Sequence, residues 1–182
     1  LRGLAAVDAS TAWVGGSKGS LYRTTDGGLT WRDVAPPQSA ACDFRDLQAF
    51  GRDTALAMVA GEPARVYRTD DGGASWRIVL EDPRRGAFFD GLAFVGDVGV
   101  LFGDPLEAAF CLFTSRDAGR TWPPVPREQL PAPLAGEASF AASGTSVAAT
   151  GQPGQERFWI ATGGGARARV LRGDGGRWQA VD

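Results

Sequence analysis

An eight-residue pattern recurs along the chain and constrains its fold more than any other feature. The pattern reads hydroxyl, any residue, Asp, small, Gly, any residue, hydroxyl, Trp, and it occurs at 24–31, 69–76 and 115–122. A degenerate fourth copy at 172–178 lacks the hydroxyl residue and brings the Trp one position closer. Because an apolar or aromatic run precedes each copy, each copy predicts a β-hairpin in which the octet is the turn.

The residue types in the octet suit a tight turn. An Asp in such a turn accepts hydrogen bonds from nearby backbone N–H groups, and a Ser or Thr can bond across the turn. The Gly supplies a positive φ that a residue with a Cβ resists. We expect the Trp to start the next strand and to bury its ring against the neighbouring sheet.

The spacing of the octets predicts the architecture. Successive pattern aspartates lie 45, 46 and 57 positions apart. This period is typical of one four-stranded blade of a β-propeller. We therefore predict an all-β fold with one β-propeller domain over 1–182. Its four antiparallel blades should span about 1–36, 37–82, 83–126 and 127–182.

Strands are predicted within each unit. The first unit should hold strands at 3–7, 11–16, 20–24 and 30–34, and the last strand of the third unit should lie at 121–123. The fourth unit has one candidate too many before its octet. The candidates there are 138–142, 146–150, 157–162 and 168–172, so the extra residues form either a hairpin or an extended second strand.

The octets resemble Asp-boxes, or BNR repeats, of a β-propeller superfamily that includes sialidases, sortilin and photosystem II assembly-factor-like proteins. The segments 43–46, 88–90, 102–105 and 136–144 are similar to a group of bacterial exported BNR-repeat proteins. Those proteins are often labelled oxidoreductase or glycosyl hydrolase. The resemblance implies a periplasmic or extracellular location. It also implies that the box residues are structural and lie away from the ligand face: Asp26, Trp31, Asp71, Trp76, Asp117, Trp122, Asp174 and Trp178.

The number of blades predicts an open assembly. The chain starts at a first strand and ends after a fourth strand, so it holds four whole blades and no split blade to close a ring. Four blades is the low end of the propeller range. We expect an incomplete propeller, which is either the first part of a longer protein or a piece paired with another chain. Its unpaired blade edges favour association, including self-association. A closed four-bladed ring is the less favoured alternative.

Charged residues gather where first strands begin. Aligning the four strand entrances places Arg2, Arg45, Asp90 and Glu137 at equivalent positions, with Asp43 and Asp46 beside Arg45 and Asp104 in a nearby loop. This set is a candidate binding site at the channel mouth. The alternative is that these charges form ion pairs that pack the blades together. Trp13 and Trp159, in second strands, are interpreted as core residues rather than sugar platforms.

Composition excludes several functions. A net charge of −2 argues against general nucleic-acid binding, and no apolar run is long enough to cross a bilayer. With no His, the chain lacks a Ser-His-Asp triad and a His-ligated zinc site. We expect no metal and no cofactor.

The function predicted is a non-enzymatic protein-interaction scaffold that binds a protein or a carbohydrate through the loops joining strand 4 to strand 1 and strand 2 to strand 3. The alternative is a hydrolase of glycosides with paired carboxylates. A hydrolase should place two carboxylates about 5–9.5 Å apart in an open cleft, whereas a scaffold should have them neutralised by arginine.

Overall fold

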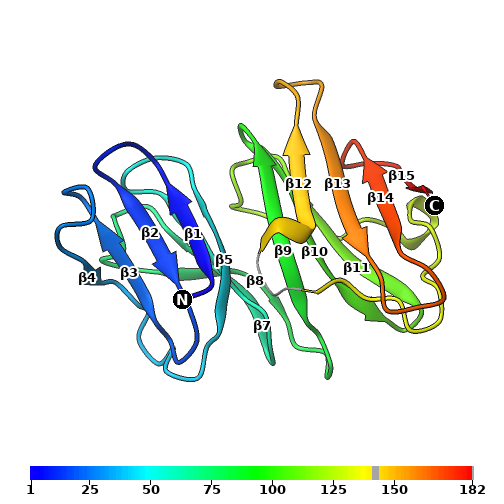
Figure 1. Cartoon of the computed structure of the whole chain (residues 1–182), viewed down its shortest axis with the longest axis horizontal. Coiled ribbons are helices and arrows are strands. Elements are labelled where there is room, and N and C mark those ends of the chain that lie inside the picture. Colours follow the sequence, from blue (N-terminus) through cyan, green and yellow to red (C-terminus); the bar gives the residue numbers. More distant parts are fainter. Residues whose placement is uncertain (141–143, 182) are drawn as a thin grey trace.

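The computed structural model describes residues 1–140 and 144–181, and its described part consists of strands joined by turns and two short 3-10 helices (Figure 1). The strands are β1 Gly3–Ala6, β2 Ala12–Gly15, β3 Leu21–Thr24, β4 Arg32–Asp33, β5 Phe44–Ala49, β6 Ala55–Val59, β7 Ala64–Thr69, β8 Arg77–Asp82, β9 Phe89–Val95, β10 Val98–Leu106, β11 Ala109–Ser115, β12 Val147–Thr150, β13 Arg157–Thr162, β14 Arg169–Gly173 and β15 Trp178–Val181. The 3-10 helices are η1 Arg127–Gln129 and η2 Gly144–Ser146.

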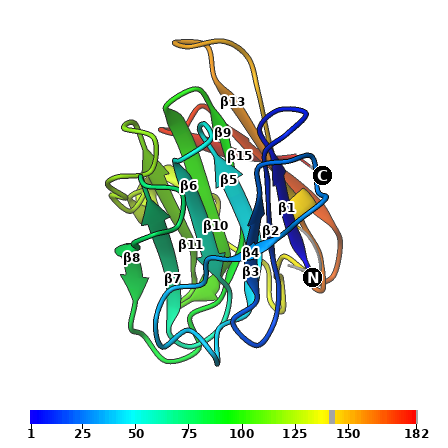
Figure 2. The same ribbon diagram turned by 90° about the vertical axis from the view of Figure 1, so that its left-hand side faces the viewer.

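The strands form four antiparallel sheets in chain order, each a meander in which neighbours in sequence are neighbours in space. We name them blade 1 (β1–β4), blade 2 (β5–β8), blade 3 (β9–β11) and blade 4 (β12–β15). The first strands of successive blades pack against one another, β1 on β5, β5 on β9 and β9 on β12. Blade 1 and blade 4 lie at opposite ends of the long axis (Figure 1), and the view from one end shows the sheets one behind another (Figure 2). The fold is a β-propeller architecture, as predicted.

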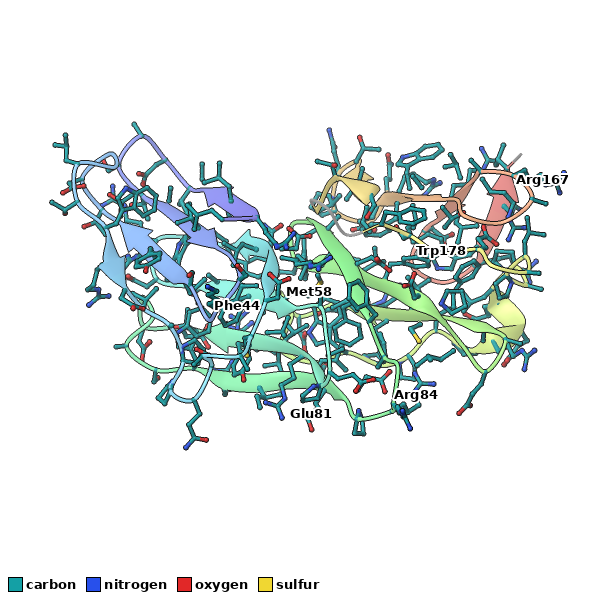
Figure 3. The ribbon with its side chains drawn as sticks, turned by 60° about the horizontal axis from the view of Figure 1, so that its bottom comes forward. Phe44, Met58, Glu81, Arg84, Arg167 and Trp178 are labelled. Atoms are coloured by element: carbon teal, nitrogen blue, oxygen red, sulfur yellow. The ribbon has the colours of Figure 1, made fainter. Side chains whose placement is uncertain are left out.

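The core lies between blades rather than inside one sheet. Each interface holds its own cluster of buried apolar side chains, and Phe44, Met58 and Trp178 mark the three clusters in turn along the molecule (Figure 3). Strand β13 shows why, because its side chains alternate along the strand. Phe158 and Ile160 are buried toward blade 3, while Trp159 between them points to the opposite face and is exposed. The prediction that Trp13 is a core residue is confirmed, and the same prediction for Trp159 is wrong.

One fourth strand is shorter than predicted, and another is absent from the described residues. In blade 1 the strand is reduced to β4, two residues long. In blade 3 no fourth strand forms at 121–123, and a single bridge between Phe113 and Pro124 takes its place. Proline has no N–H to donate to a ladder. Pro123 and Pro124 therefore supply carbonyl oxygens only, and the N–H of Thr114 donates to Pro123 O at 3.0 Å.

The surplus strand candidate of the fourth unit is also resolved. The first strand of blade 4 is β12, which corresponds to the candidate at 146–150. In the segment 138–142, Ala138 forms only an isolated bridge with Gly163, and residues 141–142 lie outside the described residues. Because β12 is the first strand and β13 begins only at Arg157, the described residues show neither alternative, the hairpin or the extended second strand.

The burial of each box tryptophan depends on whether another blade precedes its own. Trp122 and Trp178 are buried and Trp76 is partly buried, each against the preceding blade. Trp31 in blade 1 is 42% exposed, so the expectation that it buries its ring is wrong. No blade precedes blade 1 in the described residues to cover it.

Candidate binding rim

Each blade presents two kinds of loop on opposite rims. Because the strands form meanders, the β3–β4 and β1–β2 types of connection share one rim, and the β2–β3 and β4–β1 types share the other. We call the first the Asp-box rim and the second the charged rim. On the Asp-box rim the first three boxes each donate a backbone N–H to the neighbouring loop of their own blade, as Gly72 N does to Asp53 O at 2.9 Å. The candidate residues Arg2, Asp43, Arg45, Asp46, Asp90, Asp104 and Glu137 all belong to segments that reach the charged rim.

Inside the Asp-boxes the carboxylate is engaged by its own turn. Asp71 Oδ1 accepts the N–H of Ser75 at 2.9 Å and the hydroxyl of Thr69 at 2.8 Å, and Oδ2 accepts the Ser75 hydroxyl. Asp26 and Asp117 have the same partners in their own boxes. For Asp26 and Asp71 the hydroxyl and backbone donors of these bonds lower the pKa to about 2.

The other two boxes differ in detail. Burial raises the pKa of Asp117, but the Thr121 hydrogen bonds outweigh it and the pKa is again about 2. The fourth box has no hydroxyl residue, and Asp174 accepts the backbone N–H groups of Gly176 and Arg177 instead. These backbone hydrogen bonds lower its pKa.

On the charged rim two arginines converge on one carboxylate. Arg2 Nε lies 3.0 Å from Asp43 Oδ1, and Arg45 Nε donates to Asp43 Oδ2 at 2.9 Å. Asp43 ends the connection from blade 1 to blade 2, and Arg45 is the second residue of β5. The guanidinium of Arg45 also lies over the ring of Phe88, 5.1 Å from its centroid. The residues immediately before or at the start of three first strands are thereby brought together.

Asp46, by contrast, faces the interior and joins two blades. Its Oδ1 accepts the N–H of Leu47, and its Oδ2 accepts the N–H of Leu92 in β9, both at 2.9 Å. Burial raises the pKa of this carboxyl to about 6, although the two backbone donors act in the opposite direction. Asp46 thus links the first strands of blades 2 and 3 and is not available to a ligand.

Asp90 and Asp104 both belong to blade 3, Asp90 as a buried and Asp104 as a partly buried residue. Asp90 is fully buried at the start of β9, and Asp104 lies in β10. Burial raises the pKa of Asp104, while the N–H of Ser139, at 3.0 Å from Asp104 Oδ1, and a side-chain hydrogen bond with Asp90 lower it. Ser139 precedes blade 4, so Asp104 connects the third blade to the fourth.

Glu137 is not at a strand entrance. The first strand of blade 4 begins at Val147, so the alignment of Glu137 with Arg2, Arg45 and Asp90 is wrong. The carboxylate is buried and binds Arg169, whose Nε donates to Oε1 at 3.0 Å. The Thr162 hydroxyl and the Leu134 N–H also donate to it. Burial opposes ionisation, but these donors prevail and lower the pKa of Glu137.

Sequence reasoning missed the residues that engage these carboxylates. Arg169 is the buried partner of Glu137, and Phe88 is the ring beneath Arg45. The one sequence signal for Arg169 is that it precedes the apolar residues Val170 and Leu171 at the start of β14. Among the described residues, no group of His, Cys, Asp and Glu is arranged to hold a metal ion. In the same residues no helix has the length and apolar character that a membrane crossing needs.

Comparisons with known proteins agree with the fold. Residues 1–87 match the family described as photosynthesis system II assembly factor YCF48, and the search of curated proteins found no match. A solved structure of YCF48 bound to a D1 peptide is 19% identical, with a TM-score of 0.54 over 99% of this chain and 68% of that one. YCF48 from Cyanidioschyzon merolae is 16% identical, with a TM-score of 0.62 over 99% of this chain and 55% of that one.

Enzymes share the fold as well. The GH74 xyloglucanase of Xanthomonas campestris is 19% identical, with a TM-score of 0.68 over 98% of this chain. This chain covers 29% of the xyloglucanase, so it corresponds to part of each of these longer propellers. At this identity the solved structures show the fold alone. The repeated Asp-boxes, the bladed architecture and the family match together show that the chain is a BNR-repeat β-propeller similar to the photosystem II assembly factor YCF48.

Proposed function

We propose that the chain is a non-enzymatic scaffold that binds a peptide segment of a partner protein across the charged rim. The observation that carries the proposal is the cluster at the mouth of blades 1 to 3, where Arg2 and Arg45 converge on Asp43 and Arg45 lies over Phe88. The BNR propeller of YCF48 binds a peptide, the D1 peptide. That comparison supports a protein partner for this chain.

The cluster has the chemistry that a peptide needs. Peptides present carbonyl and carboxylate oxygens, and guanidinium groups donate to both in a fixed planar geometry. The Arg2 side chain is 38% exposed, so it can donate to a second acceptor while it remains paired with Asp43. Asp43 holds both guanidinium groups in place before a ligand arrives, which lowers the entropy that binding costs.

The carboxylates of the rim favour a scaffold over a hydrolase. Asp43 is neutralised by Arg2 and Arg45, and Glu137 is neutralised by Arg169. Asp46 accepts two backbone N–H groups and is buried. A glycoside hydrolase needs one carboxyl group as an acid and a second, free carboxylate in an open cleft. Carbohydrate binding or hydrolysis is therefore the competing function that the experiment must distinguish from peptide binding.

Two further properties belong to the proposal. We place the chain in the periplasm or outside the cell, as the resemblance to exported BNR-repeat proteins implies. Self-association of the chain through its two end blades is proposed as well.

Peptide binding is tested by panning a displayed random-peptide library against the purified chain. Binding of the enriched peptides is then measured by calorimetry for the wild type, Arg2→Ala and Arg45→Ala. We expect each substitution to weaken binding by about tenfold or more, because a charge-assisted hydrogen bond contributes roughly 1.5–3 kcal/mol. Arg120→Ala, an exposed arginine of the third Asp-box on the other rim, is the matched control and should leave binding unchanged.

Three results would contradict the proposal. They are the absence of enriched peptides, an equal loss in the Arg120→Ala control, and the release of reducing ends from xyloglucan by the purified chain. Thermal unfolding of each variant separates lost binding from lost folding. Arg2 is exposed, so its removal should leave the melting temperature close to that of the wild type.

A further inference from the structure

The same two positions lie next to each other at all three interfaces between blades, and at two of the interfaces a hydrogen bond joins them. The first position is the last third-strand residue whose side chain faces the next blade. The second is the small residue that follows the Asp in the next blade's Asp-box. Arg23 Nη1 donates to Gly72 O at 3.3 Å, and Arg68 Nη1 donates to Ala118 O. At the third interface the residue is Thr114, and a Cβ at Gly175 would lie 3.9 Å from its methyl carbon.

A second contact accompanies the first. The second-strand residue paired with Arg23 is Trp13, and its ring packs edge-on against the box Trp76 of the next blade, at 6.1 Å between centroids. The equivalent residues in blades 2 and 3 are Leu56 and Val100, and both are fully buried in the clusters that contain the next box tryptophan. At each interface, a pair of residues on the second and third strands of one blade thus packs against the first small residue and the Trp of the next blade's box.

Blade 4 carries the equivalent pair of residues on its outer face, and among the described residues no following blade covers that face. Trp159 pairs with Arg172, as Trp13 pairs with Arg23. Arg172 in turn pairs with Gln179, next to the box Trp178, which confirms the equivalence although this box is shorter. Trp159 is 39% exposed, and Arg172 is exposed beside it. Both line a pocket on the outer face of blade 4 together with Arg157, Asp174, Arg177 and Gln179.

Blade 1 carries the complementary half. Its box presents Gly27, at the position of Gly72 and Ala118, and Trp31, at the position of Trp76. The Trp31 ring is 42% exposed, and Leu4 beside it in β1 is 68% exposed. These residues line an apolar groove on the outer face of blade 1. The two halves of an interface formed three times inside the chain therefore lie open at its opposite ends (Figure 1).

We propose that blade 1 of a second copy of the chain docks on the outer face of blade 4, with the box of one copy on Trp159 and Arg172 of the other. Arg172 would donate to the Gly27 carbonyl, as Arg23 does to Gly72, and Trp31 would pack on Trp159, as Trp76 packs on Trp13. This inference names the contacts of the proposed self-association and is independent of peptide binding at the charged rim.

The assembly that follows is head-to-tail. Such heterologous contacts generate a ring when the rotation closes and a filament when it does not. Two copies bring eight blades together, which is within the usual range of four to eight blades for a propeller. In a closed pair, both end faces of both copies are covered and no apolar groove stays open.

Sedimentation velocity over a wide concentration range tests the proposal. The wild type should form a species of about 38 kDa, twice the 19.1 kDa of one chain, or longer assemblies of the same contact. Arg172→Glu and Trp31→Ala should each raise the dissociation constant by about tenfold or more. Arg85→Glu and Ile78→Ala are the matched controls, since both residues are exposed on blade 2 or the loop that follows it and lie outside the end faces.

Mixing the two variants separates head-to-tail docking from nonspecific aggregation. The Trp31→Ala chain keeps an intact blade 4 face, and the Arg172→Glu chain keeps an intact blade 1 face. A mixture should therefore recover association through one interface, while each variant alone stays monomeric. A wild type that is monomeric at every concentration overturns the proposal. The outer face of blade 4 would then be expected to bind an Asp-box blade other than blade 1 of a second copy. Association that survives both variants also overturns it.

The failure of this inference is distinguishable from failure of the proposed function. Arg172 and Trp31 lie away from the Arg2–Asp43–Arg45 cluster, so Arg172→Glu should bind the enriched peptides like the wild type. Loss of self-association with intact peptide binding supports both proposals. Circular dichroism and thermal unfolding test whether the variants fold. We expect that they do, because the substituted side chains are exposed.

Discussion

At the scale of single residues, Asp46 makes the stability of the protein depend on pH. Its pKa is raised from 3.8 to about 6 by burial in the folded protein. Between about pH 4 and pH 6 the folded state therefore retains a proton that the unfolded state has lost, so the free energy of unfolding falls as the pH rises through this window. A difference of about two pKa units corresponds to at most roughly 3 kcal/mol.

Chemical denaturation of Asp46→Asn at several pH values measures this contribution. The amide does not ionise, so we expect the slope of stability against pH between about 4 and 6 to decrease strongly relative to the wild type. A smaller slope should remain, because burial also raises the pKa of Asp104. Asp97→Asn, an exposed acid, should keep the full slope. Parallel curves for Asp46→Asn and the wild type would contradict the assignment.

The Asp-box carboxylates act in a different pH window. The pKa values of Asp26, Asp71 and Asp117 are lowered to about 2, so their stabilising hydrogen bonds are fully present above pH 3.8 and are lost as the pH falls through about 2. The bonding of these carboxylates could be predicted from sequence because every partner lies within four residues. The burial of Asp46 could not, because its second partner, Leu92, is 46 residues away.

At the scale of elements, one buried arginine holds blade 2 to blade 3. Arg68 is 1% exposed and donates to the Ala118 carbonyl and to Asp70. We expect Arg68→Ala to lower the free energy of unfolding by roughly 2–4 kcal/mol, because it leaves a buried carbonyl without its donor and removes a partly buried ion pair along with the packing of a buried side chain.

Arg77→Ala is the matched control for Arg68→Ala. Arg77 pairs with the same carboxylate, Asp70, but is 51% exposed, so its removal should cost less than about 1 kcal/mol. Urea denaturation of both variants measures the difference. Equal losses in the two variants would show that Arg68 does not link the blades.

Elements were predictable where local pattern determines them. The hairpins around the boxes follow from the octets, and the second and third strands lie within a few residues of their predicted positions. The fourth strand of blade 3 failed because Pro123 and Pro124 cannot donate to a ladder. The first strand of blade 4 was ambiguous because four candidate segments compete for the three strand positions before the octet. Only packing against β9 identifies β12 as the inner strand.

At the scale of the whole molecule, the Asp-box repeat predicts which residues pack between neighbouring blades. Every internal interface buries a box tryptophan and a second-strand residue of the preceding blade. On the end blades no described residue supplies this partner, and Trp31 and Trp159 are exposed there. Reading Trp159 as a core residue was wrong because core and end positions have the same local sequence pattern. Only the order of blades distinguishes them.

Hydroxyl-radical footprinting of the six tryptophans in the dilute, monomeric chain tests the open arrangement most directly. Trp31 and Trp159 should be oxidised fastest, Trp76 at an intermediate rate, and Trp13, Trp122 and Trp178 slowest, in the order of their exposure. A monomer in which Trp31 and Trp159 are as protected as Trp122 would contradict the account, because its end blades would then cover one another.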